Sequence, residues 1–206
     1  MTKTIGASDV HTELVVIGSG PGGYTAAFRA ADLGMKVTLI DRYANSGGVC
    51  LNVGCIPSQA LLHVAKVIDD SKEAAVTGLY FNEPKLDLEA MKNWKNKLIS
   101  GLTRGLKGLA DKRNVTVLQG SAYFISADSL KIDSDDGESL LTFEQCIIAA
   151  GSEPATLAFL PNDPRIIDST VALNLTEIPN NILIIGGGII GLEMATIYSA
   201  LGSEVS

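Results

Sequence analysis

The sequence predicts an α/β fold in which one nucleotide-binding domain is followed by the beginning of a second. Three observations support this expectation: short apolar runs typical of buried parallel strands, a glycine-rich loop after two of these runs, and a helical segment after each loop. The length of 206 residues agrees with it, because domains have about 150 residues and the chain therefore holds more than one domain and fewer than two.

Composition and charge narrow the class of protein. Hydrophobic residues make up 46% and charged residues 19% of the chain, which excludes disordered, collagen-like and coiled-coil proteins. The formal charge of −7 and the lack of a basic stripe argue against nucleic acid and anionic membranes as partners. Three cysteines are too few for a secreted disulfide scaffold, and the N-terminal residues lack the apolar core of a signal peptide. We therefore expect a soluble, cytoplasmic protein.

The first nucleotide-binding unit is expected between residues 14 and 41. Residues 14–17 form an apolar strand, residues 24–33 form an alanine-rich helix that ends at Gly34, and residues 36–40 form a second strand that runs into Asp41. A strand, a glycine turn, a helix and a second strand in this order make one βαβ unit with parallel strands.

The loop between the first strand and its helix has the glycine spacing of a dinucleotide site. Gly18 allows a tight turn, Gly20 lets a pyrophosphate approach the backbone, and Gly23 lets the helix pack closely on the strand. The helix N-terminus offers N–H groups and the positive end of its dipole to phosphates. Asp41 follows at the end of a strand, where it can accept hydrogen bonds from ribose hydroxyls. The alternative is that the glycines only shape an ordinary turn.

The middle of the chain is expected to hold two helices and several short strands. We predict helices at 57–75 and 86–112, and strands at 114–119, 122–125, 130–132, 140–143 and 145–151. The second helix has one apolar stripe, made of Leu88, Met91, Trp94, Leu98, Leu102 and Leu106. Asp135, Asp136 and Gly137 are typical of a turn between two strands.

The pattern of strand, glycine loop and helix recurs near the end of the chain. Its parts are an apolar strand at 182–185, the glycines Gly186, Gly188 and Gly191, a helix at 192–201 that ends at Gly202, and a strand from residue 204. The consecutive glycines and Glu193 fit a buried strand, turn and helix better than a membrane span. A unit that stops in its second strand cannot close a sheet, so we expect the chain to be a fragment. The acidic position that separates NAD from NADP is not reached.

A pair of cysteines carries the chemistry. Cys50 and Cys55 are five positions apart, and a bend at Gly54 would let them close a small disulfide ring. Pro57 suits the first turn of a helix, which would place Cys55 near a helix N-terminus, where the dipole favours the thiolate.

Three uses of such a pair are open. In a cytosolic protein, close cysteines are typical of redox-active or metal-binding thiols. Zinc would need further ligands, for which His63 is the nearby candidate. Two inert buried thiols are the third possibility, and the separate Cys146 is expected to be a small core residue.

Longer runs of sequence resemble a known family. Residues 48–58 (GVCLNVGCIPS) and 60–62 (ALL) are similar to the pyridine nucleotide-disulfide oxidoreductases, and among them to the dihydrolipoamide dehydrogenases more than to glutathione or mercuric reductases. The resemblance extends from the first glycine loop through 149–152 (AAGS) to 186–193 (GGGIIGLE). It implies a Rossmann-like FAD-binding domain, with a parallel sheet, helices and a small antiparallel part, and the start of an NAD-binding domain.

The resemblance also implies cofactors and roles for single residues. FAD would bind at Gly18, Gly20, Pro21, Gly22, Gly23, Asp41, Arg42, Gly47, Gly48, Val49, Cys50, Gln59, Ala122, Ala150, Gly151 and Ser152, and NAD at Gly186, Gly187, Gly188, Ile189, Ile190 and Gly191. The residues implied in catalysis are Cys50, Cys55, Gln59 and Glu193. Cys50 would exchange with dihydrolipoamide, Cys55 would face the flavin as a charge-transfer thiolate, and NAD⁺ would take hydride from the reduced flavin. No metal is implied.

The chain departs from the family pattern in two ways. The family has a lysine at the position of Gln59, near the flavin and paired with the glutamate that matches Glu193. Glutamine removes that positive charge, so we expect a poorer charge-transfer thiolate. The family also has a dimer-forming domain with a His–Glu base pair, and neither His11 nor His63 matches that histidine.

Together these features predict a fragment of a dihydrolipoamide dehydrogenase that is inactive by itself. Residues 1–153 would be the FAD-binding domain with the cysteine pair, 154–180 a linker, and 181–206 the start of the NAD-binding domain. The implied partners are dihydrolipoamide on a 2-oxoacid dehydrogenase complex or the glycine cleavage protein, and a second copy of the full-length chain. The alternatives are a nucleotide-binding module without turnover and a related flavin disulfide reductase of the glutathione- or mercuric-reductase type.

Overall fold

The computed structural model describes residues 10–155 and 157–206. It contains two compact units, each built from two stretches of sequence. The first combines Met1–Asn52 with Ser100–Ser152, and the second combines Val53–Ile99 with Glu153–Ser206. These units divide the chain differently from the domain ranges expected from the sequence, which remain a prediction.

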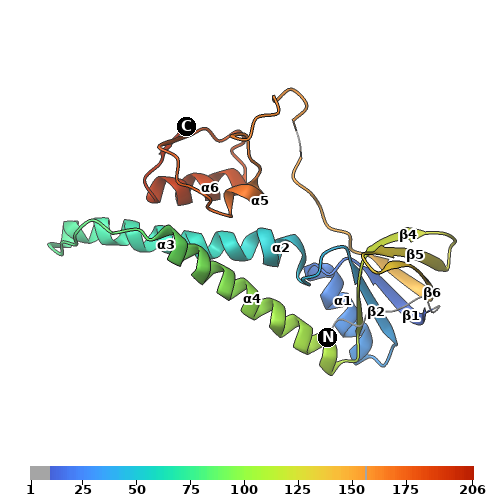
Figure 1. Cartoon of the computed structure of the whole chain (residues 1–206). Helices are drawn as coiled ribbons and strands as arrows, with labels where there is room; N and C mark the ends of the chain where they lie inside the picture. The colour runs from blue at the N-terminus through green and yellow to red at the C-terminus, as the bar shows by residue number, and fades with distance from the viewer. Residues whose placement is uncertain (1–9, 156) are drawn as a thin grey trace. The chain divides into compact units, whose positions relative to one another are not determined.

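A six-stranded sheet forms the centre of the first unit, in the order β3-β2-β1-β6-β5-β4 (Figure 1). Its strands are β1 (Val10–Ile17), β2 (Val37–Asp41), β3 (Thr116–Gln119), β4 (Ser121–Phe124), β5 (Ser129–Ser134) and β6 (Gly137–Ile148). The strands β3, β2, β1 and β6 run parallel, whereas β5 and β4 are antiparallel to their neighbours. The fold class expected from the sequence is therefore confirmed.

The apolar strands of this sheet are buried on both faces. Val16 of β1 packs with Ala27 of helix α1 (Pro21–Asp32), while its neighbour Val15 packs with Leu130 and Leu141 in a different cluster. Successive side chains of a strand point to opposite faces, so a strand covered on both sides has to be apolar throughout. The continuous run of apolar residues in the sequence has this cause.

The second unit is mostly helical. Its elements are α3 (Cys55–Glu73), the 3-10 helix η1 (Ala74–Thr77), the first half of α4 (Leu88–Lys112), α5 (Ser169–Ala172), β7 (Asn181–Ile182), α6 (Ile189–Ala200) and β8 (Glu204–Val205). Helix α6 lies along α3 (Figure 1), and Ile197 and Leu201 of α6 belong to the same buried cluster as Leu61 and Ile68 of α3. β7 and β8 form a two-stranded parallel sheet.

The region of the cysteine pair contains more helix than the sequence predicts. A short helix, α2 (Gly48–Val53), occupies it, and the next helix begins at Cys55 instead of Pro57. Pro57 still lies in the first turn of α3, where a missing N–H removes no helical hydrogen bond. The expected bend is present at Gly54, which separates the two helices with φ −139° and ψ −114°.

Three strand predictions were wrong in extent. The strands expected at 140–143 and 145–151 belong to one strand, β6, which ends at Ile148 and pairs with β1 from Leu141 to Ile148. The strand expected at 182–185 is assigned as Asn181–Ile182, although the N–H of Ile184 still donates to the carbonyl of Ser206 at 2.9 Å, which continues the same pairing.

The apolar stripe of α4 is only partly buried. Leu88 and Met91 pack against the core of the second unit. Three other members of the stripe expose between 40% and 45% of their area, namely Trp94, Leu98 and Leu102. Lys95 and Ala110, each 3% exposed, mark the buried face, so that face is turned by about one position from the stripe expected from the sequence.

One helical stretch, residues 48–77, is long and apolar enough to cross a membrane when only length and composition are considered. The bend at Gly54 interrupts this stretch. Leu61 and Ile68 lie in the core of the second unit, and Lys66 and Asp70 form an ion pair of 2.8 Å. Core packing therefore accounts for Leu61 and Ile68, two of its apolar residues.

Candidate functional site

The geometry of the first loop requires glycine at two positions. Gly18 has a φ of +100°, and a Cβ atom there would lie 2.1 Å from the carbonyl oxygen of Ala149. A Cβ atom on Gly23 would lie 1.7 Å from the carbonyl oxygen of Gly18. Both distances are far shorter than a van der Waals contact. Helix α1 therefore starts this close to the end of β1 only because these residues have no side chain.

Gly20 exposes its backbone at the start of α1, because it has no side chain. It is the N-cap of α1 and has no side chain that could cap the helix. A Cβ atom on Gly48 would lie 2.6 Å from the Cα atom of Gly20, so the two backbones meet with no side chain between them. The first N–H groups of a helix lack intrahelical partners and attract anions. The charge of a pyrophosphate suits the N–H groups at this helix start.

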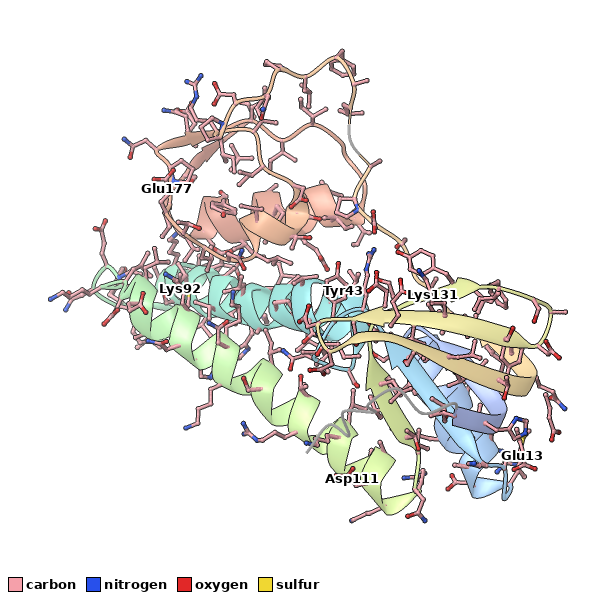
Figure 2. The ribbon with its side chains drawn as sticks, turned by 45° about the vertical axis from the view of Figure 1, so that its right-hand side comes forward. Glu13, Tyr43, Lys92, Asp111, Lys131 and Glu177 are labelled. Carbon is pink, nitrogen blue, oxygen red and sulfur yellow. The ribbon has the colours of Figure 1, made fainter. Side chains whose placement is uncertain are left out.

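Three hydrogen bonds from the described residues fix Asp41 beside the loop. The N–H and the hydroxyl of Ser19 both donate to Oδ2, at 2.7 and 2.6 Å, and the N–H of Tyr43 donates to Oδ1 at 2.9 Å. Ser19 is fully buried, whereas Asp41 is half-buried. Tyr43 is the second residue after β2 and is labelled in Figure 2. Sequence reasoning missed Ser19, because nothing local indicates a partner 22 positions away.

Backbone hydrogen bonds join the ends of the parallel strands. The N–H of Gly18 donates to the carbonyl of Ile40, and the N–H of Ala149 donates to the carbonyl of Ile17, each at 2.7 Å. From β1, the sheet continues to β2 on one side and to β6 on the other. Open α/β sheets bind ligands beyond the carboxyl ends of their strands, at the point where the strand order reverses. The first loop lies at this point of the sheet.

Other residues expected to hold FAD lie in the same unit. Arg42 is exposed, and its guanidinium carbon lies 4.9 Å from the centre of the Tyr43 ring. Ala122 is half-buried on β4, and Gly151 is exposed with a φ of +75°. A polar hollow of about 260 Å³ is lined by Arg42, Gln119, Gly120, Ser121, Asp133, Ser134 and Asp135.

The second loop repeats the geometry of the first. Gly186 has a φ of +119°, and a Cβ atom on Gly191 would lie 2.0 Å from the carbonyl oxygen of Gly186. Gly188 is the N-cap of α6, again without a side chain that caps the helix. Nothing lies within 4 Å of a Cβ atom placed on Gly187 or Gly188, so this loop is open.

The cysteines occupy different positions in their helices. Cys50 is the third residue of α2 and is half-buried, whereas Cys55 is the exposed first residue of the 19-residue helix α3. Cys146 packs against the core of the sheet, and burial raises the pKa of its thiol.

Gln59 and Glu193 lie together, as the resemblance implied. Gln59 comes one turn after Cys55 on α3, and its Nε2 donates to Oε1 of Glu193 on α6 at 3.5 Å. Gln59 is exposed and Glu193 is half-buried. A long hydrogen bond from a neutral amide is weaker than one from an ammonium group, so Gln59 does little to stabilise the negative charge of the Glu193 carboxylate.

Two further buried polar side chains were not singled out from the sequence. Lys95 is 3% exposed and its ammonium donates to the carbonyl of Leu173, while the hydroxyl of Tyr198 donates to the carbonyl of Ala172 at 2.8 Å. Burial lowers the pKa of Lys95 and raises the pKa of Tyr198. The carbonyl of Ala172 also accepts a backbone hydrogen bond from the N–H of Leu175 at 3.2 Å, so the Tyr198 hydroxyl is its second donor, and both side chains bond to carbonyls at the end of α5.

The histidines do not join the cysteine pair in a metal centre. His11 lies 3.0 Å from the hydroxyl of Thr142 in the first unit, and His63 is exposed on α3. Within residues 10–155 and 157–206, no three His, Cys, Asp or Glu side chains gather in a way that could hold a metal ion.

Comparison with known proteins gives consistent matches over nearly the whole chain. Residues 12–206 match the family model of the pyridine nucleotide-disulphide oxidoreductases. The chain is 52% identical over 200 residues to dihydrolipoyl dehydrogenase of Vibrio cholerae, and 53% identical over 201 residues to that of Haemophilus influenzae. Each alignment covers 97% of this chain and 42% of the relative, so the chain spans about two fifths of their length. The Cu(II) complex of the HOCl-induced flavoprotein disulfide reductase RclA from Escherichia coli matches with a TM-score of 0.82 and 31% identity, over 95% of this chain and 41% of that one.

Proposed function

Because this chain belongs to the pyridine nucleotide-disulphide oxidoreductase family, we propose that it is the N-terminal part of a dihydrolipoyl dehydrogenase. The overall reaction converts dihydrolipoamide and NAD⁺ into lipoamide, NADH and a proton. One observation carries the proposal: a cysteine pair lies in sequence between two glycine loops of matching geometry. The identity of 52% and 53% to two dihydrolipoyl dehydrogenases supports the choice of dithiol.

We assign the two loops to different dinucleotides. Residues 1–153 form the FAD-binding domain, residues 154–180 the linker and residues 181–206 the first part of the NAD-binding domain. The backbone cradle of Gly20 and Gly48 would hold the pyrophosphate of FAD. Bound FAD supplies a two-electron acceptor between the thiols and NAD⁺.

The cysteine pair is the electron carrier within this chain. In its oxidised form, Cys50 and Cys55 share a disulfide. A thiolate of dihydrolipoamide attacks the sulfur of Cys50, the S–S bond breaks, and Cys55 leaves as a thiolate. The second lipoyl thiolate then attacks the lipoyl sulfur that is bound to Cys50, which releases cyclic lipoamide and the Cys50 thiolate. Two electrons have then moved from the substrate to the cysteine pair.

The partners follow from the same assignment. We infer that the dithiol is carried by a lipoyl-bearing 2-oxoacid dehydrogenase complex or by the glycine cleavage protein, and that the full-length protein is a homodimer in the cytoplasm. The names of the bacterial relatives and the formal charge of −7, which suits a dissolved protein, support this inference.

A related flavin disulfide reductase is the second candidate. The TM-score of 0.82 to a flavoprotein disulfide reductase supports it, although the identity is 31% and thus lower than to the dihydrolipoyl dehydrogenases. The two candidates share every residue assigned above and differ in the disulfide that exchanges with Cys50.

The FAD site can be tested with Gly20→Ala. A Cβ atom on Gly20 has Gly48 Cα at 3.9 Å as its nearest neighbour, so the protein itself accommodates the change while the methyl group enters the cradle. We expect the parent chain to bind FAD and Gly20→Ala to bind it at least about tenfold more weakly, measured by flavin fluorescence. Gly105→Ala, at an exposed position of helix α4, is the matched control and keeps the parent affinity. Equal binding by Gly20→Ala would contradict the cradle.

The substrate can be tested in a chimera. Residues 12–206 would replace the matching part of the Vibrio cholerae enzyme, which supplies the rest of the polypeptide. We expect NAD⁺-dependent oxidation of dihydrolipoamide that is abolished by Cys50→Ser. A chimera that instead reduces glutathione disulfide, and leaves dihydrolipoamide untouched, would favour the second candidate.

A further inference from the structure

We infer that Ser19 restricts Asp41 to a single hydroxyl of the ribose bound at the first glycine loop. The inference rests on the proposed dinucleotide site and goes beyond it, because it specifies how the ribose is recognised. Ser19 does not reach the ribose itself and is a positioning residue that acts through the Asp41 carboxylate.

The hydrogen bonds of the Asp41 carboxylate carry the argument. A carboxylate has two oxygens with about two lone-pair sites each. The N–H and the hydroxyl of Ser19 both donate to Oδ2, at 2.7 and 2.6 Å, and therefore occupy both of its sites. The N–H of Tyr43 donates to Oδ1 at 2.9 Å and occupies one of the remaining two. These bonds leave one acceptor site, on Oδ1.

Burial makes this arrangement rigid. Ser19 has no exposed area, so the Oδ2 side of the carboxylate faces the protein interior, whereas Asp41 itself is half-buried. If the carboxylate turned to present Oδ2 to a ligand, two buried donors of Ser19 would lose their partner. Leaving buried donors unsatisfied is strongly unfavourable, so the carboxylate keeps its orientation.

This arrangement predicts unequal recognition of the two ribose hydroxyls. The 2′ and 3′ hydroxyls are adjacent donors, and a carboxylate with both oxygens free could accept one bond from each. With one acceptor site left on Asp41, only one of them can bond to it. The other hydroxyl contributes little through this residue.

Nucleotides that lack one hydroxyl test the inference. ADP, 2′-deoxy-ADP and 3′-deoxy-ADP contain the ribose and the pyrophosphate without the flavin, and their dissociation constants can be measured by titration calorimetry with the full chain. We expect one deoxy compound to bind about tenfold more weakly than ADP and the other to stay within about twofold, because one hydrogen bond to a charged group is lost in the first case only. In Ser19→Ala, Oδ2 loses one donor and the carboxylate can turn. The ratio between the two deoxy compounds should then fall to about two.

Ser203→Ala is the matched control. Ser203 is also a buried serine, and its hydroxyl donates over the same distance of 2.6 Å, to the carbonyl of Pro179. This variant should keep the parent ratio between the deoxy compounds. A general loss of stability would weaken all three nucleotides by one factor, and that result in Ser19→Ala would overturn the positioning role.

Two other outcomes also decide the matter. Equal weakening by both deoxy compounds in the parent chain would mean that Asp41 accepts two bonds, and the inference would be wrong while the dinucleotide site stands. A parent chain that binds neither ADP nor FAD would overturn the proposed site and this inference with it.

Discussion

Gln59 on α3 and Glu193 on α6 are joined by a hydrogen bond of 3.5 Å, which connects the helix that begins with Cys55 to the helix that follows the second glycine loop. The contact joins two segments 134 residues apart within the second unit. It brings a carboxylate near the start of the cysteine helix, and the Gln59 amide that bonds to it carries no positive charge.

Replacing Gln59 by lysine should supply that positive charge. We expect Gln59→Lys to form an ion pair with Glu193 and, in the FAD-loaded protein after reduction, to strengthen the long-wavelength absorbance of the thiolate–flavin contact. Because Gln59 is exposed, the gain in free energy of unfolding should be small, about 0.3–1 kcal/mol. The double variant Gln59→Lys, Glu193→Gln is the control and should lose the gain in stability. A full-strength band in the parent protein that the lysine leaves unchanged would refute the prediction.

The second glycine loop should tolerate no side chain at Gly191. In Gly191→Ala the new Cβ atom would lie 2.0 Å from the carbonyl oxygen of Gly186, so helix and strand would have to separate. We expect the free energy of unfolding to fall by about 2–4 kcal/mol in urea denaturation. The control is Gly187→Ala, where nothing lies within 4 Å and the change should stay within about 0.5 kcal/mol. Similar stabilities for the two variants would show that the loop relaxes around the methyl group.

Glycines in the middle of α4 should lower its stability. Gly105 and Gly108 lie inside this 25-residue helix, and a Cβ atom on either has no neighbour within 4 Å. Alanine at each position should therefore raise the free energy of unfolding by about 0.5–1 kcal/mol, mainly because the unfolded chain loses conformational freedom. Thermal and urea denaturation would measure the gain. A decrease would indicate that the helix needs these glycines for a contact made elsewhere in the longer protein.

The buried ammonium of Lys95 should make stability depend on pH. Burial lowers its pKa below the ordinary value of 10.5, so the folded chain binds this proton less tightly than the unfolded chain. The contribution of Lys95 to stability is therefore smallest below the folded pKa, and it rises with pH until the unfolded pKa near 10.5 is passed.

The difference in free energy of unfolding between the parent chain and Lys95→Met isolates this effect. It should shift in favour of the parent as the pH rises from neutral toward 10.5. Lys97→Met, at an exposed position of the same helix, is the matched control and should show no such trend. A difference that stays constant, or that shifts toward the methionine variant, would contradict the buried charge.

Local features of the fold were predictable from the sequence. The tight contact of Gly23 is with the carbonyl of Gly18, five positions earlier, and the spacing of the glycines encodes it. The same holds for the end of α1, where Gly34 has the positive φ of +93° that a glycine after a helix commonly adopts.

Features that depend on distant partners were not predictable. The role of Ser19 follows from Asp41, which folding alone brings to it. Lys95 lies at the helical spacing of a buried position, four residues after Met91, but a lysine there suggests an exposed face until the carbonyl of Leu173 is known. The continuity of β6 depends on its pairing with β1, which no turn or apolar pattern within 137–148 reveals.

The long strand β6 limits where residues can be deleted from or inserted into this protein. A two-residue turn between Ser134 and Gly137 joins β5 to β6. Strand β6 then pairs with β1, and Ala149 follows directly after it. The carbonyl of Ala149 lies close to Gly18. Deleting one residue in this turn would move every side chain of β6 to the opposite face and would disturb the nucleotide loop at its far end. The stretch 79–87 has no regular structure and is exposed throughout. A peptide tag or an inserted domain is therefore better placed in that stretch than in the hairpin, although both look like ordinary surface loops.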